Sequence, residues 1–323
     1  MEHIAGQYKR FAERETPGRS PLYEQVAASI AKDKTVLAFL AGMPPAKRQP
    51  NLLLAAVRYL YGTPCSAAEF LQVIREKSNQ VAAVMAGRTT QTNEPARCAT
   101  LLPVLARLPQ PLALLEVGAA AGLCLLPDRY AFDYGKGRIE PSSPGTTDPP
   151  LFTCHAGPEV PIPERNVEVA WRAGLDLHPI DLSDESEMRW LEALVWPGEE
   201  YRIPRLRAAR EIARDDPPRV ITGDLRTDLP GLAKQAPKNA TLVVFHTAVL
   251  AYVRDAGERA AFARSTDQLG AVWIANEAPE NIPGVAREIR RERPPGDDFL
   301  LCVDGTPTAW TDGHGTWIDW RTR

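Results

Sequence analysis

The chain has 323 residues, of which 44% are hydrophobic and 24% charged, so a substantial core can form. Its formal net charge is −3, whereas proteins that bind nucleic acids or membrane surfaces carry an excess of basic residues. The longest uncharged apolar run, Val117–Leu126, is about half as long as the roughly 20 residues of a membrane span. We therefore expect neither a nucleic acid nor a membrane as partner.

The five cysteines and five histidines are scattered along the chain. A zinc site or a disulfide framework would need short, paired spacings, so we predict reduced thiols and no metal site. The first residues, Met1–Gly6, lack the hydrophobic segment of a secretion signal. We expect a cytoplasmic protein.

The first part of the chain predicts helices. Residues that commonly cap helices precede three apolar segments with helical spacing, and Pro21 fits the first position of one of them. The caps are Ser20, Asn51 and Ser66. The last two begin helices over Leu52–Tyr61 and Ala67–Glu76, and a further helix is expected at about Pro95–Arg107. We predict an all-helical N-terminal domain over residues 1–110.

After Pro111 the pattern becomes that of an α/β fold, because short apolar runs alternate with helical segments. The expected strands are Leu112–Val117, Val167–Trp171, Arg219–Thr222, Thr241–Phe245, Ala271–Ala275, Phe299–Val303 and Gly315–Trp320. The expected helices are Ser186–Trp196, Ile203–Arg214 and Ala256–Leu269. No helical segment separates the last two strands, so they are expected to be antiparallel. We predict a second domain over residues 111–323, with a Pro/Gly-rich insertion at about 127–166.

Acidic residues stand near the ends of three expected strands. Glu116 ends the first strand and is followed by a tight turn from Gly118 to Gly122 that would open a helix. Asp176 and Asp224 end two later apolar segments. In such sheets, ligands bind at the carboxyl ends of the strands, so the three acids should lie at one edge. The alternative is that the small residues serve packing and that Asp224 caps a turn.

His246 follows the apolar strand Thr241–Phe245 and would face the same edge. An imidazole has an unperturbed pKa of about 6.5, which suits a base at neutral pH. The alternative is a histidine that holds a loop by local hydrogen bonds. His246 is the candidate catalytic residue.

These segments in succession resemble the class I S-adenosylmethionine-dependent methyltransferases. Glu116–Gly122 is similar to their glycine-rich motif, Gly174–Pro179 to their ribose-binding motif, Gly223-Asp224 to their adenine-binding motif, and Val249–Val253 to their fourth motif. The resemblance implies a Rossmann-like sheet with an antiparallel last strand. It also implies S-adenosylmethionine as cofactor, held by Glu116, Gly118, Gly122, Asp176 and Asp224.

The sequence departs from that pattern in two places. Ala119-Ala120-Ala121 stands where the family has a central glycine, and alanine replaces glycine freely only where φ is negative. Asp176 lies 58 residues after Gly118, where about 20 are usual, because of the insertion. Whether the cofactor binds is therefore left open.

The whole chain also resembles an uncharacterised bacterial family with a domain of unknown function. The segments that carry this resemblance are Arg48–Leu53, Thr92–Glu94, Arg97-Cys98, Ala121–Leu123, Asp128–Tyr130 and Leu194–Pro197. It implies a fold more firmly than an activity.

Six polar residues are candidates for binding a substrate: Asn93, Glu94, Arg97, Arg129, Tyr130 and Arg172. The first three precede the first strand, where they would hold a ligand or form an interdomain salt bridge. Tyr130 alternatively belongs to the core.

Three functions remain open. The first is a small-molecule enzyme with a methyltransferase-like cleft, performing methyl or related transfer in bacterial secondary metabolism. The second is a cofactor-independent enzyme of the same fold, a lyase or cyclase. Its arginines would hold an anionic leaving group such as sulfate, expelled by elimination or by closure of a small, aziridine-type ring. The third is a non-catalytic binding or partner subunit. The expected partner is a small molecule, either free or carried on a partner protein, and the oligomeric state is left open.

Overall fold

The computed structural model describes residues 1–91, 93–143, 145, 148–287, 289, 294 and 298–321. The chain forms two compact units, and each is built from two stretches of sequence. The first comprises Met1–Thr92 with Asp184–Pro204, and the second comprises Asn93–Ser183 with Arg205–Arg323. The division therefore differs from the single boundary predicted at residue 110.

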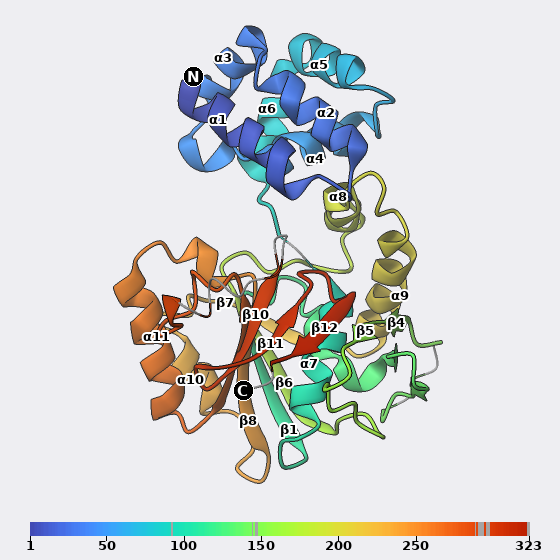
Figure 1. The fold of residues 1–323 in the computed structure, drawn as a ribbon, viewed down its shortest axis with the longest axis vertical. Helices are drawn as coiled ribbons and strands as arrows, with labels where there is room; N and C mark the ends of the chain where they lie inside the picture. The colour runs from blue at the N-terminus through green and yellow to red at the C-terminus, as the bar shows by residue number, and fades with distance from the viewer. Residues whose placement is uncertain are drawn as a thin grey trace. The chain divides into compact units, whose positions relative to one another are not determined.

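The first unit is helical (Figure 1). Its elements are α1 (Glu2–Arg10), η1 (Phe11–Glu15), α2 (Pro21–Ile30), α3 (Lys34–Gly42), η2 (Pro45–Lys47), α4 (Pro50–Tyr61), α5 (Ala67–Glu76), α6 (Ser78–Gly87) and α8 (Glu185–Leu194). The predicted caps Ser20 and Ser66 are confirmed, since their side chains accept from Tyr23 N and Glu69 N. Asn51 is not a cap, because α4 begins one residue earlier at Pro50.

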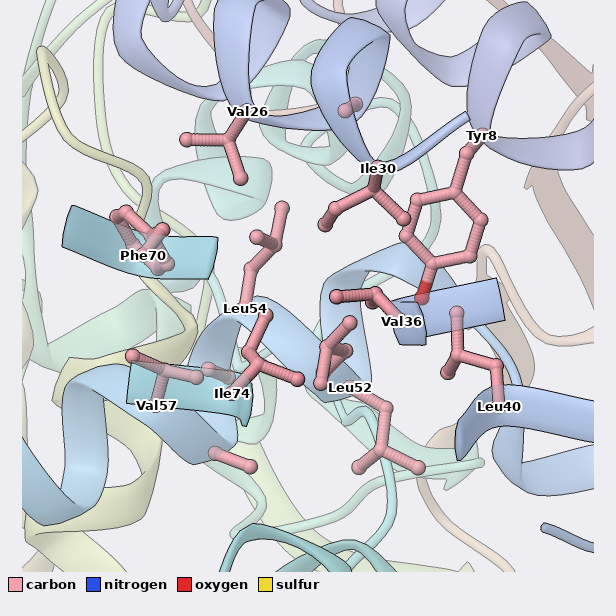
Figure 2. Close-up of a cluster of buried hydrophobic side chains, with 14 of the residues drawn as sticks. Tyr8, Val26, Ile30, Val36, Leu40, Leu52, Leu54, Val57, Phe70 and Ile74 are labelled. Atoms are coloured by element: carbon pink, nitrogen blue, oxygen red, sulfur yellow. The ribbon is translucent and has the colours of Figure 1, made fainter. Parts of the chain in front are cut away.

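Aliphatic and aromatic side chains from α1–α6 form most of the core of this unit. Figure 2 shows side chains of α2, α4 and α5 meeting in it, among them Val26, Leu54 and Phe70. The same core includes Trp190 and Trp196, which come from the distant stretch 184–204. The Arg58 guanidinium donates to the carbonyl oxygens of Ala193 and Val195. These contacts explain why that stretch belongs to the helical unit.

The second unit is an α/β structure. Its main sheet, within the described residues, has nine strands in the order β5-β12-β11-β10-β9-β8-β1-β6-β7. The strands are β1 (Leu112–Val117), β5 (His155–Ala156), β6 (Val169–Asp176), β7 (Arg219–Thr222), β8 (Thr241–Thr247), β9 (Val272–Glu277), β10 (Phe299–Val303), β11 (Thr306–Thr311) and β12 (Trp317–Trp320). The helical elements are η3 (Pro95–Arg97), α7 (Cys98–Leu105), η4 (Leu123–Leu125), η5 (Pro127–Arg129), α10 (Leu229–Ala233), η6 (Leu250–Tyr252), α11 (Ala256–Gln268) and α9 (Arg202–Asp215), whose first turn is assigned to the helical unit.

The predicted α/β class with a mostly parallel sheet is confirmed. Strands β7, β6, β1, β8 and β9 are parallel neighbours, as their buried apolar sequences predict. The expected antiparallel end is longer than predicted, because β10, β11 and β12 form an antiparallel meander. The turn Asp304-Gly305, in which both residues have positive φ, begins the unpredicted strand β11.

Two further features differ from the expectation. Strand β6 extends to Asp176, beyond the predicted end at Trp171. The insertion contributes β5 and a small sheet of β2 (Ala131–Asp133), β3 (Arg138–Ile139) and β4 (Leu151–Thr153).

The turn after β1 does not open an α-helix. It leads instead into the short turns η4 and η5, followed by β2. The described chain therefore has no long helix at this position whose N-terminus would attract an anion.

Within the described ranges, none of the helices has the length and apolar character needed to cross a bilayer.

Candidate functional site

The strand ends of the parallel sheet present two different sets of side chains. Neighbouring strands pair Glu116 with Gly174 and with Phe245, so these residues point to the same face. Alternation then places Asp176 and Thr247 on that face as well. We call it the Glu116 face, defined by Glu116, Gly174, Asp176, Phe245, Thr247 and Asn276. His246 and Glu277 lie on the opposite face, which we call the His246 face. The expected convergence of Glu116, Asp176 and His246 in one place is therefore not found.

Glu116 is the most unusual group on the Glu116 face. Its side chain is buried in the centre of the sheet edge, and the residue is 4% exposed. Its Oε2 atom has no hydrogen-bond partner among the described residues. Burial raises the pKa of Glu116 well above its usual range, and the nearby charge of Arg97 acts in the opposite direction. A buried carboxyl without a donor is costly, which favours a functional role.

Asp176 holds the turn that follows β1. Its Oδ2 accepts from Ala120 N at 2.8 Å, and its Oδ1 accepts from His178 N at 2.8 Å. Ala120 has a φ of +49°, an uncommon conformation for a residue with a Cβ. The carboxylate thus stabilises a strained turn at the point where the related motif has glycine.

Asn93, Glu94 and Arg97 are brought to the Glu116 face. Asn93 Oδ1 accepts from Ala121 N at 2.9 Å, while its buried Nδ2 has no partner among the described residues. Glu94 Oε1 accepts from Ala96 N and so caps η3.

Arg97 is 4% exposed and binds neutral oxygens. Its Nε donates to Gly313 O at 2.8 Å, and its Nη1 donates to Thr247 O and Oγ1 at 3.2 and 3.0 Å. No carboxylate of the described chain forms an ion pair with it. The guanidinium is thus a buried positive charge at the end of β8, beside the end of β1.

A chain of polar contacts continues across the Glu116 face. Thr311 Oγ1 donates to Asn276 Oδ1 at 2.8 Å, and Asn276 Nδ2 lies 3.5 Å from Thr100 Oγ1. Thr100 Oγ1 in turn donates to Arg97 O. These bonds connect β9, β11 and α7, so they fix the backbone that carries Arg97.

His246 lies in a closed cluster on the His246 face. The ring is fully buried against Phe262 and Trp273. Because an indole nitrogen only donates, Trp273 Nε1 donates to His246 Nε2 at 2.9 Å. His246 Nδ1 then donates to Glu277 Oε1 at 2.7 Å. Both ring nitrogens have partners, so this geometry does not favour His246 as a base.

Glu277 stabilises the loop after β8. Its Oε1 also accepts from Val249 N and Leu250 N. Its Oε2 is buried without a partner among the described residues. The His246–Glu277 pair thereby positions Val249.

Gly118 and Gly122 are required by contacts within the chain. A Cβ on Gly118, whose φ is +69°, would lie 2.4 Å from Val249 Cγ2. A Cβ on Gly122 would lie 2.8 Å from Val220 Cγ2. Val249 therefore packs directly against Gly118, in the turn that the resemblance assigns to cofactor binding. The Asp176 carboxylate and the contact of Val249 with Gly118 thus both hold this turn in place.

The remaining predicted residues are bound to other parts of the chain. Arg172 forms a bidentate ion pair with Asp128, both distances being 2.9 Å. Arg129 donates to Asp216 at 3.1 Å. Tyr130 is buried against Phe152 and donates to Leu123 O, as the core alternative predicts.

Asp224 is paired with Arg226, which donates to both carboxylate oxygens. Hydrogen bonds from Arg226 hold the pKa of Asp224 below its usual range.

Sequence reasoning missed Asn276 and Glu277. Both follow the expected strand Ala271–Ala275, so the rule that identified Glu116 and Asp176 applies to them equally. No pattern in the sequence predicts that Val249 packs on Gly118 and leaves no room there for a larger residue.

No cluster of His, Cys, Asp or Glu suited to a metal ion occurs in the part of the chain that the structure describes.

Comparison with known proteins places the chain in one family. A family model described as "Uncharacterized protein conserved in bacteria (DUF2332)" matches residues 5–320, so the chain belongs to this family. No curated protein matches the chain, and no solved structure matches it.

Proposed function

We propose that this chain is a small-molecule enzyme in which Glu116 transfers a proton at the carboxyl end of the parallel sheet. One observation carries the proposal: the Glu116 carboxyl is buried, its Oε2 lacks a partner in the described chain, and burial raises its pKa. A general acid or base works best when its pKa is near the working pH, and burial is how enzymes raise the pKa of a glutamate.

The proton transfer needs no cofactor. In an elimination or an intramolecular displacement, the Glu116 carboxylate would accept the proton of the substrate. The electron pair of that bond forms the new bond, and the leaving group departs with its own bonding pair. Of the three arginines predicted to hold such an anion, Arg97 is the one without an ion pair in the described chain, because Arg129 and Arg172 are paired with carboxylates.

The test compares the wild-type chain with Glu116→Gln in D2O. Each protein is incubated with a defined mixture of small metabolites, and mass spectrometry records deuterium gain or mass loss. Glu258→Gln is the control, since Glu258 is an exposed carboxylate of the same unit, paired with Arg226. We expect conversion by wild type and control but not by Glu116→Gln. Conversion that survives Glu116→Gln, or none by the wild type, refutes the proposal.

Methyl transfer from S-adenosylmethionine is the second candidate. The mostly parallel sheet with an antiparallel end supports it, because the resemblance implies a Rossmann-like sheet with an antiparallel last strand. Calorimetry with millimolar S-adenosylmethionine tests it. Heat that Asp176→Asn abolishes would support it, and no heat with the wild type would exclude it. If neither candidate survives, the chain is a binding or partner subunit.

A further inference from the structure

The Glu116 face also indicates which class of molecule the site takes. This inference rests on the proposed function, since it concerns the same site. Arg97 and Glu116 lie at the carboxyl ends of the neighbouring strands β8 and β1. Each residue is 4% exposed, and the positive charge of Arg97 acts on the Glu116 carboxyl. A buried cation and a buried acid are thus near each other at one strand edge.

The positive charge of Arg97 is not neutralised by an ion pair in the described chain. Its Nε and Nη1 donate to Gly313 and Thr247, which are neutral acceptors. By contrast, Arg129, Arg172 and Arg226 each donate to a carboxylate. A buried charge is costly unless it is paired, so Arg97 is suited to an anionic group supplied by a ligand.

Glu116, in contrast to Arg97, is suited to a positively charged hydrogen-bond donor. Its Oε2 is an acceptor without a donor, and Asn93 Nδ2 is a buried donor without an acceptor. Asn93 is held at the turn that follows β1, because its Oδ1 accepts from Ala121 N. A ligand with an ammonium group for Glu116 and an anion for Arg97 would satisfy these groups together. A ligand with one charge would satisfy only one of the two residues.

We propose that the ligand of this site is a small zwitterion, with its carboxylate bound by Arg97 and its ammonium group bound by Glu116. An ammonium group donates three hydrogen bonds and a carboxylate accepts several, which matches the donors and acceptors that the chain leaves open. Asn93 Nδ2 adds a donor for the carboxylate or for a neighbouring carbonyl group. The proton that Glu116 transfers would then come from the ammonium group or from the carbon beside it.

The first test uses the wild-type chain and calorimetry. The probes are glycine, β-alanine and 4-aminobutanoate, which separate the two charges by increasing lengths. Each is compared with its N-acetyl derivative, which keeps only the carboxylate, and with the alkylamine that lacks the carboxylate. We expect at least one zwitterion to bind at least tenfold more tightly than both of its counterparts. Binding of the singly charged counterparts with equal affinity, or no binding of any zwitterion at 10 mM, overturns the proposal.

The second test uses Glu116→Gln, with Glu258→Gln as control. We expect Glu116→Gln to bind a zwitterion and its N-acetyl derivative within about threefold of each other, because the partner of the ammonium group is gone. The control should keep the tenfold preference. A preference that survives Glu116→Gln assigns the ammonium group to another residue and overturns the proposal.

A third test compares the binding of S-adenosylmethionine with that of 5′-methylthioadenosine, in case the ligand is a cofactor of this kind. The first has the zwitterionic group and the second has only the nucleoside, so equal binding of both overturns the proposal. None of these measurements needs turnover. Zwitterion binding without Glu116-dependent conversion refutes the proposed function alone, and conversion without zwitterion preference refutes this inference alone.

Discussion

Replacing Gly118 by alanine tests the packing of the turn after β1. The φ of +69° disfavours any residue with a Cβ by about 1–2 kcal/mol. The new Cβ would also lie 2.4 Å from Val249 Cγ2, well inside the normal carbon–carbon contact of about 3.5–4.0 Å. Overpacking of this kind costs about 1–3 kcal/mol. We therefore expect Gly118→Ala to lower the free energy of unfolding by about 2–5 kcal/mol.

Two further variants separate the contributions. Gly305→Ala is the matched control, because Gly305 has a φ of +73° with no atom within 4 Å, so only the conformational cost of about 1–2 kcal/mol applies. Val249→Ala removes Cγ2 and Cγ1, the two atoms nearest to the new Cβ, and keeps only the Val249 Cβ at 3.2 Å. The double variant Gly118→Ala/Val249→Ala should therefore lose less free energy of unfolding than the two single variants lose in total. The expected difference is about 1–3 kcal/mol.

Urea unfolding followed by tryptophan fluorescence measures these differences. Five of the seven tryptophans lie in the α/β unit, so the signal reports mainly on the unit that contains Gly118. Additive costs in the double variant, within about 0.5 kcal/mol, would refute the packing of Val249 on Gly118. Equal costs for Gly118→Ala and Gly305→Ala would refute it as well.

Three other predictions concern stability. Burial raises the pKa of Glu116, so the folded chain holds that proton more tightly than the unfolded chain, and stability falls as pH rises above the unfolded pKa of about 4.3. Glu116→Gln should therefore raise the Tm at pH 8 but not at pH 4; an equal rise at both would contradict this cause. Asp128→Asn leaves the partly buried Arg172 guanidinium without its carboxylate, and urea unfolding should show a loss of about 1–3 kcal/mol. Asp33→Ala removes the N-cap of α3, and circular dichroism should show a loss of about 1 kcal/mol, absent in Asp33→Asn.

Local patterns in the sequence were enough to predict much of the fold. Ser20 and Ser66 cap helices because the cap depends only on residues three positions away. The apolar runs predict β1 and β8 because parallel strands are buried on both faces. Strand β11 was missed because Pro307 and alternating threonines give no apolar run, although the preceding Asp304-Gly305 favours a hairpin turn.

The candidate site was only partly predictable. Strand ends identify Glu116 and His246, but whether two residues share a face depends on register, which pairs Glu116 with Phe245 rather than with His246. The helix expected after Gly122 is absent, because hydrophobic periodicity cannot distinguish a helix from successive short turns. The tertiary fold decides that Arg97 forms no ion pair with a carboxylate of the described chain, and no local pattern shows this.

The helical unit takes residues from two separated stretches, and this has a consequence for its synthesis. Trp190 and Trp196 leave the ribosome about 100 residues after α6, so at roughly 5–20 residues per second the first helices wait about 5–20 s for them. During that interval the apolar surfaces that these side chains cover are open to other nascent chains and to chaperones. Truncation of the chain before Asp184 removes the same covering permanently, so a premature stop there leaves a product prone to aggregation.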